Sequence, residues 1–174
     1  MFDVNHLYHK VIVPTLTRMG PEYYKEHSCL QMLGTIGVES AMGTWLTQLK
    51  GGPANGIAQI ENPTAEDILF RYGDLQPERR FHIMYASFPE GYVYDKRDFN
   101  GDKLRYLLCT NMAFSVAVAR MKYWMVPAPQ PTTVLGYANY WKKYYNAAGA
   151  RGEAASEYVR LWNEWIADTL RRKM

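Results

Sequence analysis

The segment LGTIGVESAMG at residues 33–43 decides how this chain is interpreted, because it places one acid, Glu39, near the end of an apolar helical run. The run predicts a helix from Cys29 to Met42, with Ser28 as its N-cap and Gly43 as its stop. A carboxylate on an apolar helix is costly, since burying an unpaired charge either costs several kcal/mol or raises its pKa. A raised pKa suits a general acid, whose activity is expected to fall on the alkaline side.

Glycines inside this helix and turn residues after it predict what packs and folds next to it. Gly34 and Gly37 each cost roughly 1 kcal/mol relative to alanine inside a helix, which indicates close packing against this backbone. Residues 44–60 lose the helical period and contain the turn signals Gly-Gly-Pro and Asn-Gly, so we expect an irregular loop or a small hairpin there. A short helix should follow from Thr64 to Tyr72, after Pro63.

Short motifs occur around Glu39 in a definite order. Ser40 follows it directly, GIAQ occupies residues 56–59, PTA occupies residues 63–65, and YNAAG lies far downstream at residues 145–149. Together they resemble the active-site signature of the lysozyme-like superfamily. Lytic transglycosylases and phage muramidases of that superfamily carry Glu-Ser, then Gly-Leu-Met-Gln or Gly-Ile-Phe-Gln, then Pro-x-Thr, and finally Ala-Tyr-Asn-Ala-Gly. The matching pieces span roughly residues 30–165, and the later part looks most like phage-encoded members.

The resemblance implies a mainly α (α+β) fold over residues 1–174, a single lysozyme-like helical domain with a small loop or β-hairpin wall beside the substrate cleft. It implies cleavage of the β-1,4 bond between N-acetylmuramic acid and N-acetylglucosamine in peptidoglycan, by a lysozyme (muramidase, a glycosidase) or a lytic transglycosylase. Glu39 is then the catalytic acid. The residues expected to bind substrate are Ser40, Gln59, Glu61, Tyr137, Tyr145 and Asn146.

Several of these residues have more specific expected roles. Gln59 should lie opposite Glu39, where its amide would bind a sugar N-acetyl or hydroxyl group. Glu61 is the nearest candidate for a second carboxylate, or else a surface residue before the next helix. The Tyr145 hydroxyl is expected to bond the Glu39 carboxyl group or the substrate, unless the ring is a core residue. A second carboxylate would give hydrolysis; without one, the 6-hydroxyl of the substrate would attack and leave a 1,6-anhydro product. Ala58 departs from the methionine or phenylalanine of the signature, and the Ala-Ala-Gly of residues 147–149 is shifted by one.

The remaining helices follow from periodicity and capping signals. Asp3 should cap a first helix that Pro14 kinks or breaks and Gly20 ends. The segment from Leu104 to Met125 is apolar nearly all round, which predicts a buried central helix. Before it, the charged run at residues 95–102 is interpreted as a solvated turn.

Two amphipathic segments complete the chain. Thr132 or Thr133 should cap a helix from Val134 to Asn146, which presents two stripes, one for the core and one for the glycan groove. The stripes are Val134, Ala138, Trp141 and Tyr145, and Tyr137, Tyr140 and Tyr144. The segment from Glu153 to Lys173 is expected to be a packed closing helix; contact with a membrane is the alternative.

Composition excludes several classes of function. A net charge of +3 is too small to indicate nucleic-acid binding, although it is compatible with an anionic wall polymer. The two cysteines, Cys29 and Cys109, are expected to be thiols rather than a disulfide. No secretory signal or membrane span is recognisable, so we expect synthesis in the cytoplasm and action on the bacterial cell wall, as an endolysin or a virion component. We expect no metal or cofactor, and a monomer unless the chain is part of a virion.

Two rival functions make different predictions. A non-catalytic virion or glycan-binding protein with a lysozyme fold would not need Glu39. A zinc amidase or peptidase that used the four histidines would lose its activity to chelators.

Overall fold

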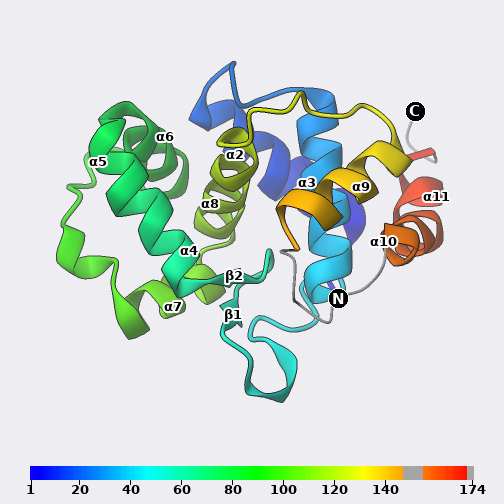
Figure 1. Ribbon diagram of the computed structural model, residues 1–174, viewed down its shortest axis with the longest axis horizontal. Helices are drawn as coiled ribbons and strands as arrows, with labels where there is room; N and C mark the ends of the chain where they lie inside the picture. The colour runs from blue at the N-terminus through cyan, green and yellow to red at the C-terminus, as the bar shows by residue number, and fades with distance from the viewer. Residues whose placement is uncertain (147–154, 172–174) are drawn as a thin grey trace.

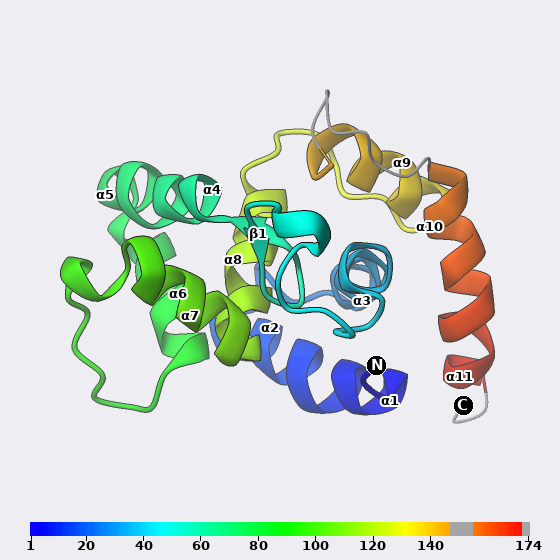
Figure 2. The same ribbon diagram turned by 90° about the horizontal axis from the view of Figure 1, so that it is seen from below.

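The computed structural model describes residues 1–146 and 155–171, and these residues form mostly helices beside one small two-stranded antiparallel sheet. Helices α3 (Glu26–Ser40) and α8 (Met112–Trp124) contact each other in the centre (Figures 1 and 2). Most residues of both helices are buried. The expectation of a mainly α fold with a small hairpin is therefore confirmed at this level.

The first helical segment follows its sequence signals. It consists of α1 (Val4–His6), a π-helical turn η1 (Leu7–Ile12) and α2 (Val13–Met19). The Asp3 carboxylate accepts a hydrogen bond from the His6 backbone N–H at 2.9 Å, which confirms it as the N-cap. Pro14 lies at the start of α2, just after the π turn, and Gly20 ends the helix with a φ of 131°.

Helix α3 begins earlier and ends differently from the prediction. It starts at Glu26, so Ser28 lies inside the helix, where its hydroxyl donates to Gln130 Oε1 at 2.8 Å instead of capping. The helix ends because Ala41 and Met42 take left-handed conformations, with φ values of 49° and 55°, before Gly43 at 71°. Glu39 therefore lies in the last turn of α3, directly before a sharp change of chain direction.

The segment after α3 forms the predicted hairpin. A single 3-10 turn (Leu49–Gly51) precedes strands β1 (Ala54–Asn55) and β2 (Ile60–Glu61), which pair Ala54 with Glu61 and Asn55 with Ile60. Helix α4 (Asn62–Glu66) and the π-helical η3 (Asp67–Tyr72) then follow, with Pro63 in the first turn as expected.

Residues 73–111 differ most from the prediction. Helices α5 (Gly73–Leu75) and α6 (Pro77–Ser87) were not expected; α6 packs against α2 and α8. The predicted long helix from Leu104 is two helices, α7 (Gly101–Thr110) and α8. The break is at Asn111, whose side chain accepts from the Phe114 N–H at 2.9 Å and so caps α8. Most of α7 is exposed, and only α8 is a buried central helix.

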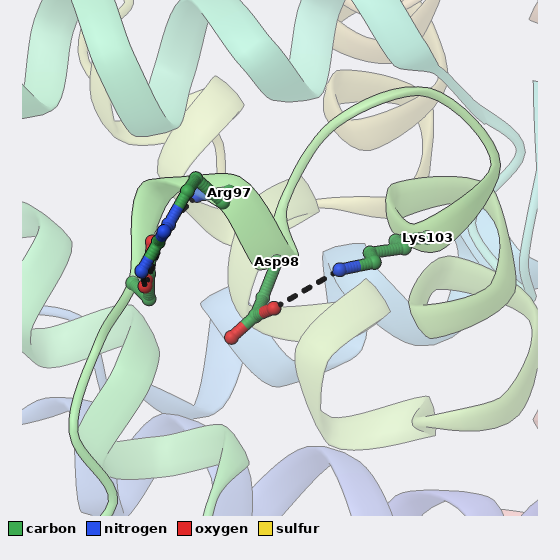
Figure 3. A network of polar contacts seen from close by, with 4 residues as sticks. Arg97, Asp98 and Lys103 are labelled. Carbon is green, nitrogen blue, oxygen red and sulfur yellow. Dashed lines mark hydrogen bonds and ion pairs between the residues drawn. The ribbon is translucent and has the colours of Figure 1, made fainter.

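The charged run before α7 is an exposed turn, η4 (Lys96–Asp98), as expected. Asp95 pairs with Arg97 at 2.5 Å, and Asp98 pairs with Lys103 at 3.3 Å (Figure 3). Because these ion pairs are largely exposed, each contributes at most about 1 kcal/mol. They shape the turn without acting as a ligand cluster.

The C-terminal helices close over α3. Helix α9 (Val134–Tyr144) is capped by the Thr133 hydroxyl, as predicted. Helix α10 (Ala155–Leu161), the π-helical η5 (Trp162–Ala167) and α11 (Asp168–Arg171) follow at the edge of the molecule (Figure 1). Tyr158, Leu161, Trp162 and Ile166 are buried against the core. This part of the chain is thus a packed closing helix, and no helix in the described ranges has the length and apolar character needed to span a bilayer.

The glycines of α3 explain how tightly α10 packs. A Cβ added at Gly34 would lie 2.1 Å from the Tyr158 hydroxyl oxygen, and Tyr158 donates to the Gln31 backbone oxygen at 3.1 Å. At Gly37, the nearest atom is the flexible end of Met42, at 3.2 Å. The predicted close packing is therefore confirmed, and it is much tighter at Gly34.

Gly34→Ala should destabilise the protein by about 1–3 kcal/mol, because overpacking against the Tyr158 ring exceeds the gain in helix propensity. Gly37→Ala is the matched control on the same helix, and it should stabilise the protein by up to about 1 kcal/mol, because the flexible end of Met42 can shift and the gain in helix propensity remains. Urea denaturation of both variants measures the difference. Equal stabilities would contradict the packing described here.

Candidate functional site

A pocket of about 470 Å³ lies beside the C-terminal end of α3. Its walls come from three separated parts of the chain: the end of α3, the loop and hairpin after it, and the C-terminal helices. The residues that line it are Gly37, Val38, Glu39, Ala41, Trp45, Gln48, Leu49, Gln59, Glu157, Arg160, Leu161 and Trp165. Glu39 and Gln59, which the sequence singled out, thus share one pocket.

Glu39 is half-buried and held by an indole from α9. The Trp141 Nε1–H donates to Glu39 Oε1 at 2.8 Å, and the Trp141 ring itself is fully buried against Tyr158. A hydrogen bond to a carboxylate from a rigid, buried donor restricts the orientation of the acid. The sequence placed Trp141 in one of two stripes without deciding which was core. Its position four residues before Tyr145 was the available signal that both face the same way.

Ser40 links α3 to the hairpin instead of facing the pocket. Its buried hydroxyl donates to the Ile57 backbone oxygen at 2.7 Å and accepts from the Gly43 N–H at 2.9 Å. These bonds join the turn after Glu39 to the segment that carries Gln59. The expected substrate contact of Ser40 is therefore corrected to a structural role, because its side chain is enclosed.

Gln59 reaches the pocket from a strained turn. It has a φ of 47°, and its side-chain N–H donates to the Gly56 backbone oxygen at 2.9 Å. Gly56 has a φ of 78°, and a Cβ there would lie 2.2 Å from the Leu108 backbone oxygen. Only glycine fits that approach. This part of the GIAQ segment is therefore needed to place Gln59 in the wall of the pocket.

The Tyr145 hydroxyl bonds the protein backbone and not a group in the pocket. Its hydroxyl donates to the Ala58 backbone oxygen at 2.7 Å, within the core. Burial, together with the negative charge of Glu39, raises the pKa of Tyr145 well above its ordinary value, so the phenol stays neutral. The expectation of a bond to substrate is corrected, since a 4% exposed ring cannot reach a ligand.

The two remaining residues expected to bind substrate are Asn146, from the third motif, and Tyr137, from α9. Asn146 is half-buried, and its backbone N–H donates to the Trp141 oxygen at 2.9 Å. Tyr137 is 2% exposed and packs against Trp162, which corrects its proposed place in the glycan groove. Both predicted stripes of α9 are in fact largely buried, because α9 is covered on more than one side. Residues 147–149 of the motif lie outside the described residues.

Glu61 lies on β2 with an exposed side chain and does not line the pocket. Burial lowers the pKa of Lys122 on α8, and the negative charges of Glu39 and Glu61 oppose that shift. Lys122 Nζ donates to the Tyr145 backbone oxygen at 2.9 Å. Sequence reasoning missed Lys122, because nothing in the apolar α8 segment marks one lysine among buried neighbours.

The outer wall of the pocket is also absent from the sequence predictions. Trp45 and Leu49 keep 37% and 57% of their surface exposed, and both are large apolar residues in a loop, which was a usable signal. From α10, Glu157 pairs with Arg160 at 2.5 Å, and this hydrogen bonding lowers the pKa of Glu157. Arg160 also pairs with Glu164. The pocket therefore carries Glu39 and an ionised, paired Glu157.

Comparisons with known proteins add no relative. Protein-family models, curated proteins and solved structures were each compared with the chain, and none of them matches it. The described residues also hold no group of three or more histidines, cysteines, aspartates or glutamates that is arranged to bind a metal. The two cysteines are free thiols, as expected.

Tyr145→Phe should lower the free energy of unfolding by about 1–2 kcal/mol, because the buried Ala58 oxygen loses its donor. Activity per folded molecule should change little, since the hydroxyl does not face the pocket. Thermal unfolding and turnover measured on the same preparation test both statements. A slow variant of unchanged stability would instead place the hydroxyl in the reaction.

Proposed function

We propose that this protein cleaves the β-1,4 bond between N-acetylmuramic acid and N-acetylglucosamine in peptidoglycan, with Glu39 as the general acid. The observation that carries the proposal is the half-buried Glu39 carboxyl group, held by Trp141 in a pocket that also contains Gln59. The order Glu-Ser, Gly-Ile-Ala-Gln, Pro-Thr and Tyr-Asn in the sequence supports the same function by resemblance.

The composition of the pocket suits a sugar polymer. Trp45, Leu49 and Trp165 provide apolar and aromatic surface, on which the apolar faces of sugar rings pack. Polar groups that orient a ligand are few, as is usual for binding pockets. Gln59 and the Glu157–Arg160 pair supply them here.

The chemistry assigned to Glu39 is transfer of one proton. The carboxylic acid gives its proton to the glycosidic oxygen while the bond from that oxygen to C1 breaks, and positive charge develops at C1. Water then adds at C1 while a carboxylate takes its proton, or the 6-hydroxyl of the muramic acid closes a 1,6-anhydro ring and gives its proton to the ionised Glu39. Glu157 lines the pocket but is held by Arg160, whereas Glu61 lies outside it. The proposal therefore includes both the hydrolysed product and the 1,6-anhydro product.

The biological setting that we propose is the bacterial cell wall. The chain would act there as an endolysin or as a component of a virion. A glycan-binding protein without catalysis is the rival that the first experiment excludes or supports.

Glu39→Gln should reduce release of muropeptides from purified peptidoglycan by at least about 10²-fold, because an amide cannot donate the proton. Mass spectrometry of the products identifies a reducing-end muramic acid or an anhydro product in the wild type. Glu78→Gln is a matched control that should keep wild-type activity, since Glu78 is a carboxylate on α6 outside the pocket. Full activity of the Glu39 variant, or absence of cleavage by the wild type with intact glycan binding, would contradict the proposal.

Trp141→Phe should lower turnover by about tenfold or more, because it removes a hydrogen bond to a charged group worth ~1.5–3 kcal/mol. It also removes ring volume from the core, so stability should fall. Trp162→Phe controls for that loss, since Trp162 is a buried indole that packs against Tyr137 and Tyr158 away from the acid. Activity per folded molecule separates the two effects: equal losses in both variants would argue against the Trp141 bond.

A further inference from the structure

A second pocket, of about 430 Å³, is lined by residues of η1, α2, α6 and the start of α8. Helix α2 packs against both α6 and α8 at this place (Figure 2). The pocket shares no lining residue with the one around Glu39, and the proposed reaction assigns it no role. Its polar lining residues are Lys10, Thr15, Arg18, Thr110 and Asn111.

Arg18 is a cation that the protein fixes in place without neutralising it. Its Nη2 donates to the backbone oxygens of Tyr85 at 2.8 Å and Phe88 at 3.3 Å, and its guanidinium carbon lies 5.1 Å from the centroid of the Tyr85 ring. These partners are all uncharged. The N–H groups of Nε and Nη1 donate to no described residue, so three of the five guanidinium donors stay available. A fixed guanidinium with available donors favours the binding of an anion.

The pocket has basic side chains and, among the described residues, no acidic side chain in its lining. Neither Lys10 nor Arg18 forms an ion pair with a described carboxylate. The sequence contains no aspartate or glutamate at residues 4–21 or at residues 103–152. All described lining residues except Ala86 come from these two stretches. An anion in the pocket is therefore attracted by two charges and meets no carboxylate in its wall.

The start of α8 adds uncharged donors to the same pocket. Met112 and Ala113 line the pocket and are the first residues of this 13-residue helix. Their backbone N–H groups precede the first intrahelical hydrogen bond, and the Asn111 side chain caps the N–H of Phe114 instead. The N–H groups and the dipole at a helix start both favour an anion.

Thr15 supplies the observation that points most directly to a ligand. It is only 3% exposed and lines the pocket, yet its hydroxyl makes no hydrogen bond to any described residue. The hydroxyls of Thr35 and Thr110, by contrast, donate to backbone oxygens four residues earlier in their helices. Because buried polar groups normally have partners, the Thr15 hydroxyl indicates a partner within the pocket.

We propose that this pocket binds a phosphodiester group of a polyol phosphate polymer, which would hold the protein on the cell wall. Donors from η1, α2 and α8 surround the pocket, and a tetrahedral anion accepts bonds from several directions, whereas a planar carboxylate has two oxygens. Val11, Pro14 and Ala86 provide an apolar part of the lining for the carbon atoms of the ester. The wall as the source of the polymer rests on the proposed function, but the binding of phosphate does not.

A lipid headgroup carries the same phosphodiester chemistry, but the lining favours a soluble polymer. A surface that binds a bilayer presents large apolar side chains that insert between the lipids. In this pocket, Val11 and Met112 are half-buried and Ala86 is buried, so none of them projects far enough to insert.

The direct test is calorimetric titration of the protein with a glycerol phosphate oligomer at an ionic strength of about 0.15 M, where distant charges are screened. Arg18→Gln should weaken binding by about tenfold or more, because the phosphate loses hydrogen bonds to a charged group. Lys143→Met is the matched control, since it removes one exposed positive charge outside the pocket and should change the affinity by less than about twofold. Equal losses in the two variants would show attraction by net charge alone and would overturn the proposal.

Thr15→Val keeps the test decisive if Arg18→Gln does not fold. Valine has nearly the shape of threonine, and the hydroxyl that it removes has no described partner, so the melting temperature should stay the same or rise. Binding of the oligomer should weaken by about two- to tenfold, because one donor to the phosphate is lost. Wild-type affinity in a folded Thr15→Val variant contradicts the proposal.

NMR locates the site with inorganic phosphate as the probe. The backbone N–H signals of Met112 and Ala113 should shift on addition of phosphate, and acetate at the same concentration should shift them less. Shifts that gather away from α2 and the start of α8, or equal shifts with acetate, are incompatible with the proposed site.

Two further measurements identify the source of the phosphodiester. Binding to phosphatidylglycerol vesicles that is lost in Arg18→Gln, without binding to the oligomer, would assign the pocket to a lipid and overturn the proposal. On purified walls, Arg18→Gln should be retained several-fold less than the wild type, while both cleave soluble glycan fragments equally; equal retention overturns the proposal. If the wild type cleaves no peptidoglycan, the proposed function fails, and the titrations with oligomer and phosphate still decide whether the pocket binds phosphate.

Discussion

The hydrogen bond from Trp141 to Glu39 is the interaction on which the site depends. It joins the last turn of α3 to α9 across about a hundred residues of sequence, at 2.8 Å. The indole can donate only where α9 is seated in the core, and α9 is seated there by Tyr137, Tyr140 and Tyr145, which are buried. Orientation of a single carboxyl group is thus secured by the packing of an entire helix. The packing of α9 offsets the free-energy cost of partly burying the Glu39 carboxyl group on an apolar helix.

Local signals were enough to locate the acid and the hairpin. Glu39 at the end of an apolar run, the turn residues after Gly43 and the cap at Thr133 depend on neighbours a few residues away, and the structure agrees with them. The expectation that Gln59 and Glu39 meet came from a resemblance, and both line one pocket. The wider lysozyme-like assignment stays a prediction.

The errors come from tertiary packing. The break between α7 and α8 at Asn111 was not predicted, because the cap of α8 depends on one polar side chain within a long apolar segment. The Tyr145 hydroxyl was expected to serve the site, but its partner, the Ala58 oxygen, is a backbone group whose position only the fold determines. Ser40 and Tyr137 carry polar groups that sequence cannot distinguish from ligand contacts. For Ser40 and Tyr145, a buried hydroxyl found its partner inside the protein, as such groups generally do.

The pocket draws its walls from distant parts of the chain: Glu39 and Trp45 come early, and Leu161 and Trp165 come late. A chain still being synthesised can fold its early helices, since domains form progressively as residues emerge. It cannot yet possess the wall that α10 and η5 provide, or the Tyr158 ring that rests on Gly34. Nascent chains on the ribosome therefore carry the acid but not the enclosed pocket, which is complete only when α10 and η5 have been translated and have docked.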